Sequence, residues 1–261
     1  MQDPDGQPPA PHLTRLMADA WPAAEQVELG EWRLRWTGGF SRRANSAVAT
    51  GHPGRDLGQA VDAVETFYAE RGRPARLQVS GRASPPELGG LLRRRGYRED
   101  APTEVWVGPL SGMRGLRGGG WDLEEAGAPD DTWWAVYAGV EHGWAAGSVG
   151  DAATEAAYRG TLLRPAAPTV FVTACRDGSK ACVGQGVAQG EWLCVQCVAT
   201  RPEHRRRGAA RAVMAALGRW GERHGCRSAY LAVLRSNAPA QALHRGAGLT
   251  PVDAYAYLCA P

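Results

Sequence analysis

The stretch "TRPEHRRRGAARAVMAAL", residues 200–217, sets three arginines directly before a glycine and an amphipathic run. Apolar residues at 210, 213, 214 and 217 recur with the period of a helix. The preceding residues, "WLCVQCVAT" at 192–200, are typical of a strand. Residues 201–208 are therefore predicted to form a loop that joins a strand to the start of a helix.

A loop of this kind can bind an anion. The first backbone N–H groups of a helix are free and the helix dipole is positive there, which together favour a phosphate or pyrophosphate. Arginine side chains add charge and paired donors. The alternative is a solvated cationic loop. Other phosphate motifs fit poorly, because the sequence has no Gly-Lys-Ser/Thr loop and no G-x-G-x-x-G with an acidic residue after the following strand.

Composition limits the classes of function. A net charge of +3 on 261 residues argues against a protein that acts through a strong general field, so neither nucleic acid nor membrane is an expected partner. The N-terminus lacks the layout of a signal peptide, and no run approaches a membrane span, so we expect a cytoplasmic protein. No metal site is expected, because Cys194 and Cys197 would point to opposite faces of a strand.

The chain divides into two halves with similar patterns. "VAT" occurs at 48–50 and again at 198–200, and Arg55-x-x-Gly58 matches Arg205-x-x-Gly208 at the same offset of 150 residues. Helix-like and strand-like segments follow in the same order in each half, which indicates an internal duplication. The predicted organisation is a disordered tail at 1–15, a first domain at 16–110, a glycine-rich linker at 111–120 and a second domain at 121–261.

Local signals predict further elements of the second half. Two strands surround an Asp177-Gly178 turn, and "SAYLAVL" at 228–234 is the strand after the amphipathic helix. Asn237 with Pro239 predicts a helix start, and Gly246 or Gly248 its end. The predicted fold class is α/β (α+β), with mixed sheets flanked by helices in both halves.

The ordered series of strand, arginine loop, helix, strand, Asn237 and "ALHRGAGL" resembles the GNAT superfamily of N-acetyltransferases, whose loop pattern is Gln/Arg-x-x-Gly-x-Gly/Ala. The resemblance covers 170–258 well and 121–261 more loosely. It implies acetyl-CoA as the co-substrate. The residues that it implies for binding acetyl-CoA are Val198, Ala199 and Thr200 along the pantetheine arm, Arg205, Arg206, Arg207, Gly208, Ala209, Ala210 and Arg211 around the pyrophosphate, and Asn237.

The two halves together are similar to the tandem GNAT proteins of actinobacteria, of which mycothiol synthase is one kind. The loop of the first half carries one arginine, and Asp56 stands where it would repel a pyrophosphate. When Gly96 is aligned with Gly248, Pro85 falls opposite Asn237. We therefore interpret the first half as a degenerate copy that has lost cofactor binding.

Acetyl transfer to an amine needs a base for the ammonium and an acid for the leaving thiolate. Relatives carry a tyrosine acid at the position of His244, which either donates the proton or only packs beside the cofactor. For the base, Glu191 is the nearest acidic residue, and Gln196 could order a water instead. Strand alternation predicts Cys194, Gln196 and Val198 on the cleft face, with Leu193, Val195 and Cys197 on the other.

The acceptor site is the least defined part. In "DDTWWAVYAGVEHGW", Trp133, Tyr137 and Glu141 suit an ammonium-bearing small molecule, although aromatics at helical spacing also occur in cores. The main hypothesis is transfer of acetyl to a primary amine of a small molecule. The alternatives are a protein N-terminal or lysine acetyltransferase and a non-enzymatic acyl-CoA-binding module. The chain is expected to be a monomer or a homodimer.

Overall fold

The computed structural model describes residues 10–141 and 152–261. The elements up to residue 114 are α1 (Ala10–Ala20), β1 (Glu25–Leu29), β2 (Trp32–Trp36), β3 (Ala47–Val48), α2 (Leu57–Ala69), β4 (Arg76–Ser80), α3 (Leu88–Arg94), β5 (Arg98–Pro109) and α4 (Leu110–Arg114). Those that follow are β6 (Asp122–Ala126), α5 (Asp131–Glu141), α6 (Ala152–Leu163), β7 (Thr169–Arg176), β8 (Ser179–Gln189), β9 (Trp192–Thr200), the 3-10 turn η1 (Pro202–His204), α7 (Ala209–Arg223), β10 (Ser228–Leu234), α8 (Ala238–Gly246) and β11 (Thr250–Cys259).

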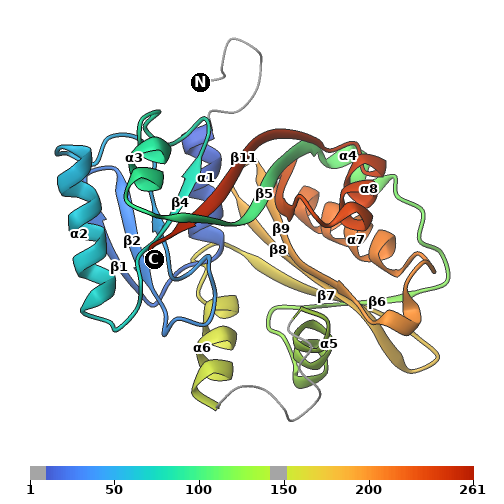
Figure 1. The fold of residues 1–261 in the computed structure, drawn as a ribbon. Coiled ribbons are helices and arrows are strands. Elements are labelled where there is room, and N and C mark those ends of the chain that lie inside the picture. The colour runs from blue at the N-terminus through green and yellow to red at the C-terminus, as the bar shows by residue number, and fades with distance from the viewer. Residues whose placement is uncertain (1–9, 142–151) are drawn as a thin grey trace.

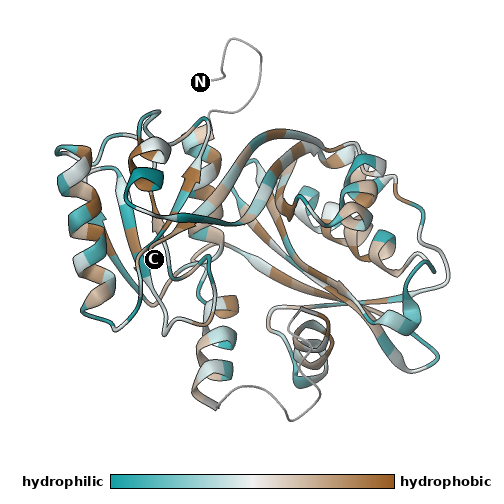
Figure 2. Cartoon of the chain, viewed as in Figure 1, coloured by the Kyte–Doolittle hydropathy of each residue, from teal (hydrophilic) through white to brown (hydrophobic). Residues whose placement is uncertain are grey.

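All described strands join one mixed sheet in the order β1-β2-β3-β4-β11-β5-β10-β9-β8-β7-β6 (Figure 1). Helix α7 packs on one face of β7, β8 and β9, and α5 packs on the other. Apolar residues gather where helices meet the sheet, whereas the outer helix faces are hydrophilic (Figure 2). The predicted fold class is thus confirmed, with a single sheet in place of two.

The two halves exchange their last strands. β5 follows α3 in the first half but pairs antiparallel with β10, from Ser228 opposite Pro109 to Leu234 opposite Thr103. β11 follows α8 in the second half but pairs antiparallel with β4. The two exchanged strands also pair with each other. The duplicated order α2-β4-α3-β5 and α7-β10-α8-β11 is therefore arranged about the middle of the sheet, and each half depends on a strand from the other.

The predicted linker and tail differ from the structure at their edges. Within 111–120, α4 packs on α7, and Met113 is fully buried. A Cβ on Gly112 would lie 2.2 Å from the Ala247 carbonyl oxygen, and one on Gly118 would lie 2.5 Å from the Ala212 nitrogen. These two glycines therefore permit a close approach of backbones that a side chain would prevent. At the N-terminus, α1 begins at Ala10, inside the predicted tail, because its apolar face is buried.

Most local predictions in the second half are confirmed. Asp177 and Gly178 both have positive φ, 51° and 72°, as a tight hairpin turn between β7 and β8 requires. Gly184 on β8 lets α7 approach, since a Cβ there would lie 2.6 Å from a methyl carbon of Val213. α8 begins after Asn237 and ends at Gly246. Within residues 10–141 and 152–261, no helix has the length and apolar character that crossing a membrane requires.

Candidate active site

The sheet opens between β9 and β10. These parallel strands pair only from Ser228 opposite Trp192 to Tyr230 opposite Cys194, and no pairing is described beyond that point. Ala232 lies in the middle of β10, an interior strand, and is nevertheless exposed. The second part of β9 therefore has a free edge toward β10, which could pair with an extended ligand that carries amide groups.

A bulge changes the side-chain alternation of β9 at this opening. Cys197 has φ 58°, and the register with β8 shifts between Val183 and Gln185. As a result, Val198 packs with the α7 core beside Leu193, whereas Cys197 belongs to the core under α5. The prediction that Val198 lines the same face as Gln196, with Cys197 opposite, was wrong because one extra residue reverses the period of two.

The arginine loop presents free backbone donors beside this opening. Arg206 and Gly208 adopt left-handed conformations, with φ 62° and 84°, and Gly208 precedes α7 without a side-chain cap. Within the described residues, the N–H groups of 206–211 have no hydrogen-bond acceptor. Trp121 anchors the loop, because its Nε1 donates to the Arg207 carbonyl at 3.0 Å.

The arginines of the loop are exposed and their charges are available. Arg205 donates from Nε to the Thr200 carbonyl at 3.3 Å. Arg206, Arg207 and Arg211 form no ion pair with any acidic side chain in the described ranges. Positive side chains and free N–H groups therefore converge at one helix N-terminus, and this donor set fits a pyrophosphate.

Asn237 lies at the same edge of the sheet as the loop, because it follows β10 as the loop follows β9, and these strands are parallel. It is exposed and caps α8, with its Oδ1 accepting from the Ala240 nitrogen at 3.2 Å. Its amide nitrogen has no hydrogen-bond acceptor among the described residues. The structure thus brings Asn237 and the arginine loop to one side of the opening.

The corresponding loop of the first half is already filled by carboxylates. Asp56 caps α2, accepting from the nitrogens of Gly58 at 2.8 Å and Gln59 at 3.3 Å. Glu31 accepts from the His52 nitrogen at 2.6 Å. Protein oxygens take the positions that an anion would need, which supports the interpretation of this half as one that no longer binds the cofactor.

Residues 11–258 match the model of the family described as "Probable histone acetyltransferase Rv0428c C-terminal". The chain belongs to this family. A relative, "Uncharacterized N-acetyltransferase YobR" of Bacillus subtilis (strain 168), is 26% identical over 253 residues, covering 94% of this chain and 96% of that protein.

Solved structures share the fold. GCN5-related N-acetyltransferase from Kribbella flavida aligns with a TM-score of 0.71 and 17% identity, covering 97% of this chain and 95% of the other. The "Tandem GNAT protein from the clavulanic acid biosynthesis pathway (without AcCoA)" gives 0.64 and 17%, covering 82% and 74%. The resemblance to GNAT enzymes is confirmed, and the chain is an acyltransferase of this N-acetyltransferase type. Enzymes of this type generally use acetyl-CoA.

His244 is buried in α8 of this GNAT fold. It is 6% exposed, its ring lies edge-on to Trp106 with centroids 6.2 Å apart, and its Nδ1 has no partner among the described residues. Burial lowers the pKa of His244 to about 4, so the ring is neutral at pH 7. A neutral imidazole is a poor acid, so the geometry favours the packing alternative.

We expect His244→Leu to reduce the acid sensitivity of folding. Unfolded His244 has a pKa near 6.5, so between pH 6.5 and about 4 the unfolded state binds more protons. The free energy of unfolding therefore falls as the pH falls through this window, by about 2 kcal/mol at pH 5. Urea unfolding at pH 7 and pH 5 should show this loss in the wild type and in a His224→Leu control, but not in His244→Leu. An unchanged loss in His244→Leu would contradict the assignment.

The two residues predicted to handle the amine proton lie elsewhere or are occupied. Glu191 is exposed at the start of β9, where the strand is still paired with β10, at the far end from the loop. Gln196 is at the opening, but its Nε2 donates to the Ala20 carbonyl at 2.9 Å and to Gln185 Oε1 at 3.1 Å. Its amide is thus held by protein groups, and its role in ordering a water stays a prediction.

Cys194 has the properties of a residue that packs beside the opening and does not act as a nucleophile. It is 4% exposed, and burial raises its pKa to about 11, although a Tyr230 hydrogen bond and the charge of Arg43 oppose this shift. The thiol is therefore neutral at pH 7 and a weak nucleophile. This agrees with direct transfer from thioester to amine.

The aromatic residues of α5 form a core. Trp133 and Tyr137 are 2% and 3% exposed and pack with Phe171 of β7 and Tyr158 of α6. The Tyr137 hydroxyl lies 3.1 Å from that of Tyr158. Their packing favours the core interpretation over an open acceptor pocket. Glu141 ends α5, and its side chain lies outside the described residues.

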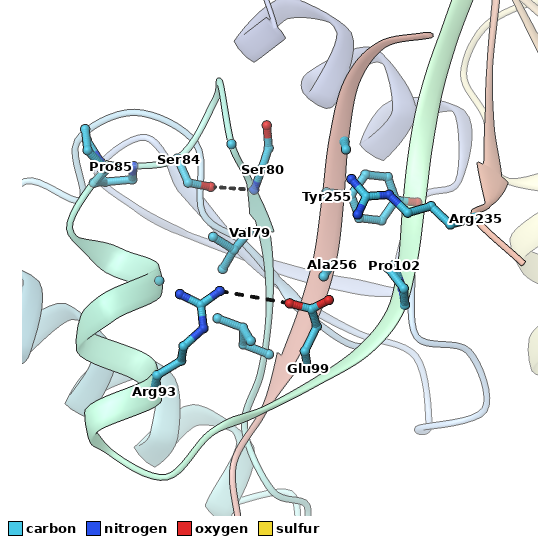
Figure 3. Close-up of a pocket in the computed structure, with 15 residues that line it drawn as sticks. Val79, Ser80, Ser84, Pro85, Arg93, Glu99, Pro102, Arg235, Tyr255 and Ala256 are labelled. Carbon is cyan, nitrogen blue, oxygen red and sulfur yellow. Dashed lines mark hydrogen bonds and ion pairs between the residues drawn. The ribbon is translucent and has the colours of Figure 1, made fainter.

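A shallow pocket of about 270 Å³ lies apart from the arginine loop (Figure 3). α3 and strands β4, β5 and β11 enclose it, and Arg93 and Arg235 extend into it from opposite sides. Arg93 pairs with Glu99 at 4.0 Å. No residue of β9, the arginine loop or α7 lines this pocket, so it is not the acetyl-transfer site.

The sequence interpretation missed Arg43. It comes from the segment between β2 and β3 of the first half, yet its Nη1 donates to Gln196 Oε1 of β9 at 3.1 Å. No local sequence pattern could indicate this contact, because 153 residues separate Arg43 from Gln196. Arg43 therefore stands beside the opening although it comes from the first half.

Proposed function

We propose that this enzyme transfers the acetyl group of acetyl-CoA directly to a primary amine of a small molecule. The observation that carries the proposal is the run of N–H groups at 206–211 and the arginines there, none of which has an acceptor or acidic partner among the described residues, except that Arg205 donates to the Thr200 carbonyl. They lie beside the open edges of β9 and β10. In the first half, carboxylates fill the equivalent position. This contrast supports a single acetyl-CoA site per chain, in the second half.

Each part of the site has a distinct task. The edge of β9 at 198–200, where Arg205 already donates to the Thr200 carbonyl, would offer its remaining backbone groups to the amides of the pantetheine arm. Residues 205–211 would hold the pyrophosphate through arginines and N–H groups. Asn237 adds an amide donor at the same edge. Bound acetyl-CoA would supply the thioester, whose acetyl group would pass to the amine nitrogen as the C–S bond breaks and the amine proton ends on the released CoA thiol. The buried, neutral thiol of Cys194 is not expected to intercept the acetyl group. His244 packs near Trp106 and is a neutral imidazole, hence a poor proton donor, near pH 7.

A second candidate is a protein acetyltransferase that modifies lysine or an N-terminus. It is favoured by the description of the family as a probable histone acetyltransferase. A protein substrate needs a groove open along the acceptor side, whereas a small amine needs only the space at the opening. Membership in an acetyltransferase family argues against the non-enzymatic acyl-CoA-binding alternative.

The test is incubation with acetyl-CoA and two sets of acceptors. One set contains small primary amines, and the other contains lysine-bearing and free N-terminal peptides, including histone tail peptides. Mass spectrometry would follow free CoA thiol and acetylated products together. We expect acetylation of at least one small amine with equimolar thiol release. Transfer confined to the peptides, or thiol release without any acetylated amine, would contradict the proposal.

A further inference from the structure

Arg43 reaches from the first half to the transfer site of the second. Its Nη1 donates to Gln196 Oε1 at 3.1 Å, and its guanidinium carbon lies 4.1 Å from the centroid of the Trp21 ring. Gln196 is itself held by the Ala20 carbonyl and Gln185. Neutral groups therefore orient this guanidinium, and only one of its N–H donors has an acceptor among the described residues.

The charge of Arg43 has no counter-ion in the described chain. It is partly buried, and no carboxylate lies within 4.0 Å. Neighbouring arginines differ: Arg42 pairs with Asp100 at 2.6 Å, and Arg33 pairs with Asp19 at 2.6 Å. A guanidinium withdrawn from water without a counter-ion costs free energy, which an arriving anion would recover.

A second cation lies against the same tryptophan. Arg35 is 2% exposed, and its Nη2 donates to the Trp21 carbonyl at 2.6 Å, while its Nε has no partner among the described residues. The pKa of Arg35 is lowered to about 10, mainly by burial and with a smaller contribution from the charge of Arg43. Arg35 at the Trp21 carbonyl and Arg43 over the Trp21 ring thus place two positive charges beside this residue, and we call the three residues the Trp21 wall.

Within the Trp21 wall, Trp21 packs in the core on the side of β9 opposite to α7, and Arg43 contacts β9 through Gln196. Gln196, which Arg43 contacts, stands where β9 leaves β10, and the bulge at Cys197 follows at once. The α7 core lies on the other face of the strand. An anion on Arg43 would therefore hold an acceptor at the opening, across β9 from the core under α7.

We propose that Arg43 binds a carboxylate of the acceptor, so that the substrates are amines that also carry a carboxylate, such as amino acids. This inference rests on the proposed transfer to small amines. The planar guanidinium matches a carboxylate through paired N–H···O bonds. A lysine side chain in a basic peptide, or a polyamine, would bring only positive charge to the Trp21 wall and be repelled.

Matched substrates and matched variants test this role. Each amino acid would be compared with its carboxamide, in the wild type, in Arg43→Gln and in Arg42→Gln, whose arginine is one residue away and paired at the surface. We expect Arg43→Gln to lower kcat/KM for the carboxylates about 10- to 100-fold, chiefly through KM, with little change for the carboxamides. Arg42→Gln should change neither. The carboxylate-to-carboxamide ratio within each variant cancels the folded fraction, and comparison of this ratio between variants cancels the difference in amine basicity.

An equal fall for both substrate classes would overturn the assignment and leave Arg43 a structural residue. A binding experiment separates this failure from failure of the proposed function. N-acetyl amino acids and their amides would be titrated calorimetrically into the protein with CoA present. Tighter binding of the carboxylates, lost in Arg43→Gln, supports the inference even if no transfer is seen. Equal binding of the two classes overturns it even if transfer occurs.

Discussion

Gly208→Asp is expected to lower the affinity for acetyl-CoA about 100-fold or more relative to Gly208→Asn. Gly208 has φ 84°, and asparagine and aspartate are the residues that best tolerate this conformation after glycine. A Cβ would have room, since its nearest neighbour is the Gly118 Cα at 3.5 Å. The pair therefore differs only in one charge. At about 4 Å from a phosphate, that charge costs about 4 kcal/mol.

Calorimetric titration of acetyl-CoA into both variants measures this difference. Thermal unfolding of each serves as the control, because the backbone strain at 208 is the same in the two proteins. Equal affinities for acetyl-CoA would place the pyrophosphate away from this loop. The first half offers a natural parallel, since Asp56 occupies the N-terminus of α2 in the same way.

Separating the halves is expected to unfold the second one. A fragment of residues 116–261 lacks β5, which lies between β10 and β11 in the sheet. It also loses Trp106, which is fully buried in the core under α7. β10 and β11 would then expose unpaired backbone edges, which favour aggregation. We expect the fragment alone to be insoluble or without cooperative unfolding.

Co-expression of residues 1–115 with the fragment supplies β5 and should restore a soluble complex. Size exclusion and circular dichroism would follow both samples. A fragment that folds cooperatively by itself would show that the exchange of strands is not needed for stability.

Sequence patterns predicted the elements whose signals are local. The period of α7, the cap at Asn237 and the turn at Asp177 and Gly178 all depend on neighbouring residues. The exchange of β5 and β11 has no such signal, because a strand shows the same alternation whichever neighbour it pairs with. The bulge at Cys197 likewise has no sequence pattern that predicts it.

The site was predicted where one segment builds it and missed where distant segments meet. The arginine loop lies within twelve residues of chain, so its charges and glycine could be interpreted together. Arg43 lies in the other half, and only the packing of the two halves brings it to Gln196. The pKa of His244 depends on burial against Trp106, which spacing along a helix does not reveal.

The most direct test of the account is calorimetric titration of acetyl-CoA into the whole wild-type chain. The free donors at 206–211 and the filled loop at 56–59 predict one site per chain. The Gly208→Asp variant should show no such site, while Gly208→Asn keeps it. Two equivalent sites per chain, or binding that Gly208→Asp leaves intact, would contradict a single acetyl-CoA site in the second half.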